Sequence, residues 1–406
     1  MTGNNKKSRP NWSELNQELL GIIASKLLYL DIIRFKAVCS SWFAAAERYS
    51  SPGPLLLCPL TRETDAEHVR LGACSIKDGT IYDLNLEFEK PEDVFSASDG
   101  FRFIGSSHGW MVAEDKGSEL YLMNVFSRTC IPLPEKGTIP TTQSYGPKFS
   151  MIQSPTMIQK AILTANPSLD ENYKVIIIYG CREKLAFCGF GDQEWVRFSN
   201  SDGYDDVVCY DTLLYALREG QIEVWEISDS CSPTKKICLE CCYTTDSSYP
   251  REICCTQWYL APSLGELLLI ERFIGEFVDD QGQLHPEGDL LTDEDSHPLL
   301  FPYKTFSFQV YKLNMIEKKL EKVTSLKDQV IFLGGNHGIS LSVKDYPEFM
   351  PNSIYYTDDY WDRMHEDYLY GGHDFGSYSL EENSIASLVP YCVERFDPTP
   401  FWVFPN

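Results

Sequence analysis

Five cysteines grouped in two short segments are the residues whose spacing first suggests chemistry. Cys238, Cys241 and Cys242 form one group, and Cys254 and Cys255 form the other. Thiolates at such spacings can hold a tetrahedral zinc ion. However, adjacent residues of a strand point to opposite faces, so at most one cysteine of each adjacent pair could join a common site. We interpret the groups as two strands of one hairpin, with cysteine as a small apolar residue, and predict no metal site.

Histidines and carboxylates form no ordered catalytic set in the sequence. His108 and His337 each precede a glycine, and His373 lies in a glycine-rich turn, so we interpret all three as hydrogen-bonding residues of turns. Asp293 and Asp295 have the first spacing of a calcium loop but lack its glycine and terminal glutamate. Motifs for phosphate binding, dinucleotide binding and a serine nucleophile are absent from the sequence. We therefore predict no catalytic residue, no cofactor and no enzyme activity.

An acidic and aromatic segment from Asp358 to Asp362 has two interpretations. It could form a surface patch for recognition, because aromatic side chains are frequent in the centres of binding surfaces. It could also be the end of a strand followed by a turn, which aspartate favours. The sequence leaves both interpretations open.

The charge balance excludes two classes of partner. The 406 residues include 59 Asp and Glu against 35 Lys and Arg, a formal net charge of −24. Nucleic-acid binding needs clustered positive charge, and binding to an anionic membrane surface needs it too. No apolar stretch is long enough to span a bilayer, and the polar N-terminus lacks the apolar part of a secretory signal. We therefore expect an intracellular protein, in the nucleus, the cytoplasm or both, with protein partners.

Helical signals are confined to residues 12–48. The first helix is predicted to begin near Asn16, and one of its faces has i, i+4, i+8 spacing: Leu19, Ile23 and Leu27. Asp31 is the predicted N-cap of a second helix, and Ser40 or Ser41 is the predicted cap of a third. Three helices in so few residues bury little apolar surface. Part of that surface should be covered either by the C-terminal domain or by the helices of a partner.

The helical segment resembles an F-box from Trp12 to Trp42, and its Val-Cys-x-x-Trp element is the most specific part of the match. In that family the helices bind a Skp adaptor, which connects the receptor to a cullin–RING ligase. The resemblance implies that eight residues make or support this contact: Leu15, Leu19, Ile23, Leu30, Ile33, Val38, Cys39 and Trp42. The family usually has proline where this chain has Asn16. Both residues suit a helix start, so the difference bears on the affinity for the adaptor and not on the fold.

From Leu55 onward, short apolar or alternating runs between turn residues indicate a large all-β domain. Roughly two dozen runs at four strands per blade predict about six blades, whereas about 45 residues per blade predict seven or eight. We therefore predict a small all-α F-box of three helices followed by a six- to eight-bladed β-propeller, which is a closed fold with few exposed strand edges. We expect Leu55–Leu57, or another early strand, to complete a blade with the C-terminal strand around Trp402 and Val403.

The predicted organisation is a disordered tail over residues 1–10, the F-box over 11–49, a linker over 50–54 and the propeller over 55–406. Residues 276–303 interrupt the strand pattern with a run of acidic side chains. We interpret this run as a mobile loop on one rim of the propeller, which either binds a partner or only interacts with water.

Several short motifs of the β-rich part occur in a specific order: Ile104–Trp110, Leu122–Ser127, Tyr259–Ile270, Phe308–Leu313, Asn352–Asp359 and Phe401–Pro405. In this order they resemble plant F-box proteins with the "kink suppressed in bikinin" type of β-propeller. The resemblance implies the substrate-recognition subunit of a Skp–cullin–F-box ubiquitin ligase, whose propeller binds an unknown target. A non-degradative protein that binds or sequesters its ligand remains an alternative. A propeller enzyme would need convergent carboxylates, histidines or metal ligands.

Overall fold

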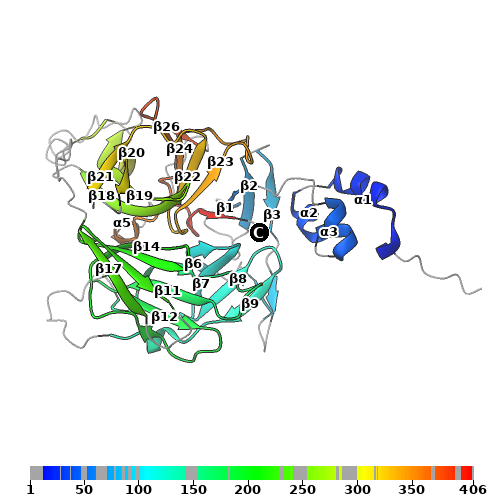
Figure 1. The fold of residues 1–406 in the computed structure, drawn as a ribbon, viewed down its shortest axis with the longest axis horizontal. Coiled ribbons are helices and arrows are strands. Elements are labelled where there is room, and N and C mark those ends of the chain that lie inside the picture. The colour runs from blue at the N-terminus through cyan, green and yellow to red at the C-terminus, as the bar shows by residue number, and fades with distance from the viewer. Residues whose placement is uncertain are drawn as a thin grey trace, which may run out of the picture. The chain divides into compact units, whose positions relative to one another are not determined.

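The computed structural model describes residues 12–27, 29–36, 38–46, 53–60, 71–76, 79–84, 87–89, 94–96, 101–141, 154–181, 183–227, 233–240, 254–279, 283–285, 300–314, 317, 319–366, 371–388 and 395–404. The chain divides into two compact units, of which the first ends at Gly53 and the second runs from Pro54 to Phe404 (Figure 1). None of the helices in these residues has the length and apolarity needed to cross a bilayer. The predicted tail over residues 1–10 lies outside the described residues.

The first unit consists of short helices: η1 (Trp12–Glu14), α1 (Gln17–Ala24), α2 (Tyr29–Lys36) and α3 (Ser40–Ala46). Asn16 caps α1, because its side-chain oxygen accepts a hydrogen bond from the Glu18 amide at 2.9 Å. The predicted start of this helix is therefore confirmed. Asp31 was wrongly predicted as an N-cap, because α2 begins at Tyr29 and Asp31 lies in its first turn.

The core of the helical unit differs from the predicted face of α1. It contains Leu20, Ala24, Phe35, Ala45 and Ala46. Leu20 and Ala24 are also four residues apart, and the alanines on both helices leave room for α1 and α3 to pack closely. Leu20 and Ala24 therefore face the core, and the neighbouring residues Leu19 and Ile23 of α1 face away from it. Leu27 follows the end of α1 and packs against the core, whereas Leu19 and Ile23 are exposed, so the prediction that these three residues share one face is wrong.

Strands of the second unit form six sheets of four or five strands within the described residues, arranged as six propeller blades. In sheet order, the first blade consists of β27 (Phe401–Val403), β1 (Leu55–Pro59), β2 (Leu71–Ser75) and β3 (Ile81–Asp83), and the second of β6 (Phe101–Ser107), β7 (Trp110–Asp115), β8 (Leu120–Asn124) and β9 (Thr129–Pro132). The third consists of β10 (Ile158–Leu163), β11 (Lys174–Tyr179), β12 (Lys184–Gly189) and β13 (Val196–Arg197), and the fourth of β14 (Tyr204–Tyr210), β15 (Leu213–Arg218), β16 (Gln221–Glu226) and β17 (Thr234–Glu240). The fifth consists of β18 (Cys254–Ser263), β19 (Glu266–Asp279), β20 (Leu300–Asn314) and β21 (Lys319–Val323), and the sixth of β23 (Ile339–Ser342), β22 (Gln329–Leu333), β24 (Ser353–Tyr356), β25 (Gly376–Ser379) and β26 (Ser384–Ser387). The remaining elements are the hairpin β4 (Glu87–Glu89) and β5 (Val94–Ser96), the 3-10 helix η3 (Lys136–Thr138) and the short helix α5 (Trp361–Glu366).

The ring closes between the two ends of the β-rich unit, as predicted. Strand β27 pairs with β1, with Leu55 opposite Val403 and Leu57 opposite Phe401. Trp402 of β27 is fully buried, and the centroid of its ring lies 5.1 Å from that of the Phe332 ring on β22. A strand from the C-terminal end therefore completes the blade that the first strands begin.

Apolar side chains from neighbouring sheets form the cores of the ring. Leu122 of β8 and Ile177 of β11 share one such cluster, and Val208 of β14 and Leu260 of β18 share another. Gly105 permits a close approach of two blades, since a Cβ atom there would lie 2.0 Å from the carbonyl oxygen of Ala161 on β10. The blades are thus held by burial between sheets, with little space for larger side chains at this point.

Two strands correct the predicted acidic loop. Strands β19 and β20 have 14 and 15 residues, far longer than the short runs that indicated strands in the sequence. Their pairing reaches Asp279 opposite Leu300, so residues 276–279 and 300–303 belong to strands and not to a loop. Residues 280–282 and 286–299 lie outside the described residues. These long strands also explain why the count from chain length gave too many blades.

Candidate functional site

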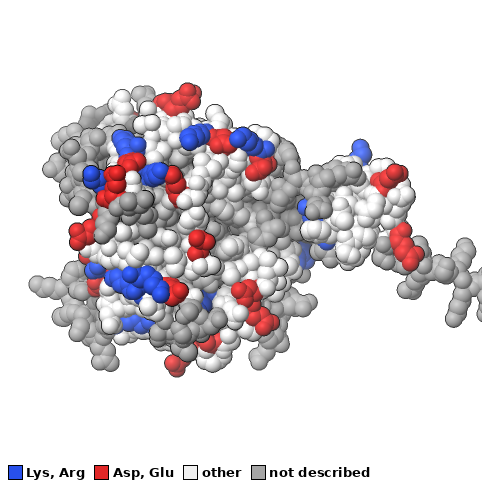
Figure 2. All heavy atoms as spheres, in the orientation of Figure 1, with Lys and Arg blue, Asp and Glu red and all other residues white. Residues whose placement is uncertain are grey.

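The helical unit exposes a set of large apolar side chains, in contrast to its small core. Their exposed fractions are Trp12 60%, Leu19 51%, Ile22 59%, Ile23 38%, Val38 57% and Phe43 51%. The face of this unit seen in Figure 2 carries few charged side chains. Folded proteins rarely leave so many large apolar groups together in water unless another molecule covers them.

Of the eight residues predicted to contact or support contact with an adaptor, three are exposed: Leu19, Ile23 and Val38. Leu15 and Trp42 pack against the core of the unit instead. The Trp42 ring lies 4.3 Å from that of Phe35, and its indole N–H donates a hydrogen bond to the Trp12 carbonyl at 3.1 Å. Trp42 therefore holds the helices together and supports the surface from within.

The other predicted positions are less exposed or lie outside the description. Cys39 is half-buried, with its sulfur 3.1 Å from the Ser41 hydroxyl oxygen. Leu30 and Ile33 lie on α2, and their side chains are outside the described part of the chain. Trp12, Ile22 and Phe43 are also exposed and were not predicted. Ile22 directly precedes the predicted Ile23, and Phe43 directly follows the predicted Trp42.

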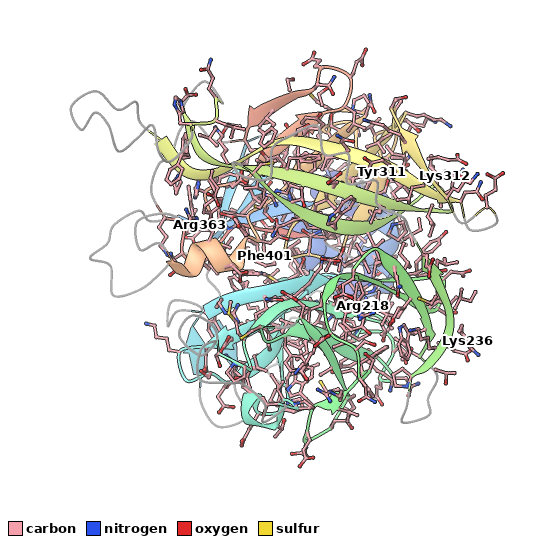
Figure 3. All side chains as sticks on the ribbon, turned by 90° about the vertical axis from the view of Figure 1, so that its left-hand side faces the viewer. Arg218, Lys236, Tyr311, Lys312, Arg363 and Phe401 are labelled. Carbon is pink, nitrogen blue, oxygen red and sulfur yellow. The ribbon has the colours of Figure 1, made fainter. Side chains whose placement is uncertain are left out.

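The propeller contains a cavity of about 240 Å³. Its walls come from segments far apart in the sequence: Gln159 and Lys160, Ile178, Glu183, Tyr204 and Asp205, Thr256 to Tyr259, Gly335, and Asp359 to Asp362. The short helix α5 contributes Trp361 and Asp362, and Figure 3 faces the side of the propeller on which this helix lies, with its Arg363 labelled. The acidic and aromatic segment noted in the sequence is thus a wall of this cavity.

Neither interpretation of that segment describes it fully. Asp358 is completely buried, and its carboxylate accepts a hydrogen bond from the Tyr303 hydroxyl at 2.7 Å. The strand before it ends at Tyr356, and α5 begins at Trp361. The segment is therefore a strand end followed by a short helix, and its last four residues line a concave surface.

A buried arginine fixes this segment in place. Arg272 lies on β19 with no exposed surface, and its guanidinium donates hydrogen bonds to Asp359 Oδ1 at 2.9 Å and to Asp374 Oδ2 at 3.0 Å. It also donates to the Thr357 carbonyl at 2.9 Å and the Thr305 hydroxyl at 2.7 Å. The planar fork of arginine offers more N–H donors than an ammonium group, and it holds them in fixed directions. Sequence reasoning missed Arg272, although one arginine inside an apolar strand signals a buried partner.

Lys160 forms a second buried ion pair at the cavity. Its ammonium lies 2.6 Å from Asp206 Oδ1, and both side chains are at least nine-tenths buried. The other carboxylate oxygen of Asp206, Oδ2, accepts a hydrogen bond from the Leu260 amide at 2.7 Å, so both oxygens have a partner. The positive charge of Lys160 is consequently balanced by a carboxylate that does not line the cavity.

Two other carboxyl groups of the cavity hold protons more tightly than usual. Burial, followed by the charges of Asp205, Asp362 and Asp202, raises the pKa of Glu183 to about 7. Burial, followed by the charges of Asp206 and Glu219, raises the pKa of Asp205 to about 6. Asp205 still reaches solvent, but the surrounding protein displaces much of the water around it. Burial thus favours the protonated, neutral form of both carboxyl groups.

The two turns in which a histidine precedes a glycine meet in the structure. The rings of His108 and His337 stack at 5.8 Å, and His337 Nδ1 lies 2.9 Å from the Ser107 hydroxyl oxygen. Burial and the neighbouring His108 lower the pKa of His337 to about 4, so this histidine is neutral at physiological pH. His373 donates a hydrogen bond from Nε2 to the Tyr303 carbonyl oxygen at 2.9 Å. These contacts fit the predicted role in hydrogen bonding.

The cysteine groups do not form the predicted hairpin. Cys238 lies on β17, whereas Cys254 and Cys255 lie on β18 of the next blade. Cys241 and Cys242 are outside the described residues. Within the part of the chain that the structure describes, no group of three or more His, Cys, Asp or Glu side chains is placed to hold a metal ion.

Comparisons with known proteins agree with both units. The sequence model of the KIB1-4 beta-propeller family matches residues 73–379. F-box protein SKIP23 from Arabidopsis thaliana is 23% identical over 423 aligned residues, which cover 97% of this chain and 95% of that protein. F-box protein At2g05970 from the same plant is 23% identical over 419 aligned residues, which cover 100% and 98%. The chain therefore belongs to the KIB1-4 beta-propeller family, and its resemblance to plant F-box proteins of this type is confirmed.

Proposed function

We propose that this chain is the substrate-recognition subunit of a Skp–cullin–F-box ubiquitin ligase. The helices bind a Skp-type adaptor and through it a cullin, and the propeller binds the target protein, in the nucleus or the cytoplasm. The chain carries out no covalent chemistry itself; it raises the effective concentration of the target beside the enzyme that transfers ubiquitin.

The exposed apolar set of the helical unit is the observation that supports this proposal. Leu19 and Ile23 lie one turn apart on α1 with more than a third of each side chain exposed, and Val38 before α3 is 57% exposed. Burial of such groups in an interface is favourable, by about 25 cal/mol per Å² of apolar surface. A helical partner that covers them would therefore stabilise the complex.

Asn16 bears on the affinity of this contact. It replaces the proline usual in F-boxes, yet it caps α1 through the Glu18 amide. Asn16→Pro removes this cap, at a cost of about 1 kcal/mol to the helix, so adaptor affinity and the free energy of unfolding are both measured on the two proteins to separate the two effects.

The test is adaptor capture by the full chain and by surface variants. Leu19→Asp with Val38→Asp places charges on the exposed set without removing Trp42 or another core residue, and should reduce binding of a purified Skp adaptor at least about tenfold. The control is Leu169→Asp with Met350→Asp, two exposed apolar residues of the propeller at 85% and 60%. Undiminished capture by the first variant would refute the docking assignment. A target half-life unchanged by removal of the protein would instead favour the non-degradative alternative.

A further inference from the structure

The cavity of the propeller combines aromatic rings with uncharged polar side chains. Trp258 and Tyr360 line it and are partly exposed. Gln159, Gln257 and Thr256 line it as well. We propose that this cavity binds the neutral ring of a sugar, a pyranose, which is either free or attached to a protein. The inference goes beyond the ligase assignment, because it concerns the propeller alone and does not depend on the helices binding an adaptor.

The buried ionic groups at the cavity are already paired and do not select a charged ligand. The Lys160 ammonium lies 2.6 Å from Asp206 Oδ1, and Asp359 accepts a hydrogen bond from the buried Arg272 at 2.9 Å. Burial, followed by the nearby carboxylates, raises the pKa of Glu183 to about 7, so its neutral form is well populated near physiological pH. An ion that enters the buried part of the cavity would therefore lose water without a free counter-charge, whereas a neutral ligand avoids this cost.

The two exposed rings can pack against one face of a sugar. A pyranose carries several C–H groups on one face, and these are attracted to the negative face of an aromatic ring while apolar surface is buried. Trp258 lies on β18 and Tyr360 lies between β24 and α5, so the rings come from two different elements. Tyr259 and Trp361 also line the cavity but are only 3% and 7% exposed, so they form its wall. A ring with an apolar face and polar edges fits this arrangement.

The amide side chains can bind the hydroxyl groups of a sugar. Gln159 is half-buried, and its amide makes no hydrogen bond with another residue of the described part of the chain. Gln257 donates to the Asp359 carbonyl oxygen at 3.4 Å, which is long enough that a ligand can compete for this donor. A primary amide offers two N–H donors and a carbonyl acceptor, and a hydroxyl group both donates and accepts. The polar part of the wall therefore suits hydroxyl groups.

Two buried oxygen atoms beside the cavity wall have no hydrogen-bond donor. Gly335 lines the cavity, and the next residue, Asn336, has a fully buried side-chain oxygen without a partner among the described residues. The Thr357 hydroxyl is equally buried and without a partner in the same part of the chain, and a Cβ atom on Gly334 would lie 2.1 Å from its oxygen. A buried acceptor without a donor is unfavourable. A hydroxyl group of a ligand, directly or through a water molecule, is the kind of donor that these oxygens need.

The size of the cavity indicates how much of a sugar it holds. A volume of about 240 Å³ is smaller than the roughly 300–1,000 Å³ of sites for drug-sized ligands. It therefore suits one sugar ring and not a chain of several. A sugar phosphate is disfavoured, because its charge would be repelled by a protein with a net charge of −24.

The test is isothermal titration calorimetry of the full chain with the methyl β-glycosides of glucose, galactose and N-acetylglucosamine. At least one of them should bind with a Kd on the order of 1 mM. Cyclohexanol keeps a ring but has a single hydroxyl group, and glycerol has hydroxyl groups but no ring; both should bind at least about tenfold more weakly. The best sugar is then attached to the serine of Gly-Ser-Gly. Equal affinity for this glycopeptide indicates a sugar carried by a protein, and loss of binding indicates a free sugar as the ligand.

Variants of the wall complete the test. Trp258→Leu removes a ring face and Gln159→Met removes an amide of similar shape, and each should weaken the best glycoside by about tenfold. Gln159→Met carries little risk to folding, because this amide has no partner among the described residues. Phe190→Leu and Gln193→Met make the same changes at exposed positions outside the cavity and should leave binding unchanged.

Three results would overturn the proposal: no binding of any of the three glycosides, equal affinity for the best glycoside and cyclohexanol, or equal losses in the wall variants and their controls. The thermal midpoint of each variant shows that it is folded. Adaptor capture is measured on the same proteins, so a failure of the cavity and a failure of the helical contact are seen separately.

Discussion

Removal of the buried Arg272 charge should destabilise the propeller far more than removal of an exposed one. Methionine in its place keeps an unbranched side chain of similar length but takes away all guanidinium donors. Asp374 and Asp359, whose side chains are 1% and 10% exposed, would then be left without their cationic partner. Loss of one partner from a buried ion pair costs about 3–5 kcal/mol, and we expect Arg272→Met to lower the free energy of unfolding by about this amount.

The measurement is urea denaturation of the full chain, followed by tryptophan fluorescence and circular dichroism. Lys344→Met is the matched control, because Lys344 pairs with Asp328 at 2.9 Å but is 80% exposed. Its removal should change stability by no more than the error of the measurement. A loss below about 1 kcal/mol for Arg272→Met would show that the buried network contributes little, and would refute the reasoning.

The pH dependence provides a second check on the same variant. Burial raises the pKa of Asp359, and Arg272 is the largest influence that lowers it. Without the guanidinium this pKa rises further, so the variant gains stability as protonation neutralises the orphaned carboxylate. The difference in the free energy of unfolding between the original protein and the variant should therefore be largest at neutral pH and should shrink as the pH falls.

A further prediction concerns the closure of the ring. Deletion of Phe401–Asn406 removes the strand opposite Leu55–Leu57 and the fully buried Trp402; loss of that ring alone costs about 3–5 kcal/mol, so the thermal midpoint should fall sharply, and an unchanged midpoint would contradict closure by this pairing.

Local patterns carried much of the fold. The helical segment, the change to short strands after Leu55, and turns at residues such as His108 depend on side-chain periodicity and on the conformations of Gly, Asn and Asp. The start of α1 at Asn16 was predictable because a cap acts within one turn of the helix. The number of blades was harder to predict, because strands as long as β19 and β20 give a blade more residues than the average on which the length-based prediction relied.

The cavity could not be located from local patterns. Asp358–Asp362 stood out as acidic and aromatic, but Lys160, Glu183 and Trp258 had no signal that would join them to it. They lie far apart in the chain and meet only because successive blades surround a common axis. The exposed face of α1 was also uncertain, because two stripes with the same spacing were apolar and the packing of alanines decided which one turned inward.

The sequence by itself determined the order of helices and strands, the acidic charge and the F-box and propeller motifs, because each depends on residues close together in the chain. Tertiary structure alone decided which of these residues meet: Trp402 beside the first strands, Arg272 beside Asp374, and Cys238 in a different blade from Cys254. Such pairings depend on burial between blades over long sequence separations, and no local pattern encodes the partner.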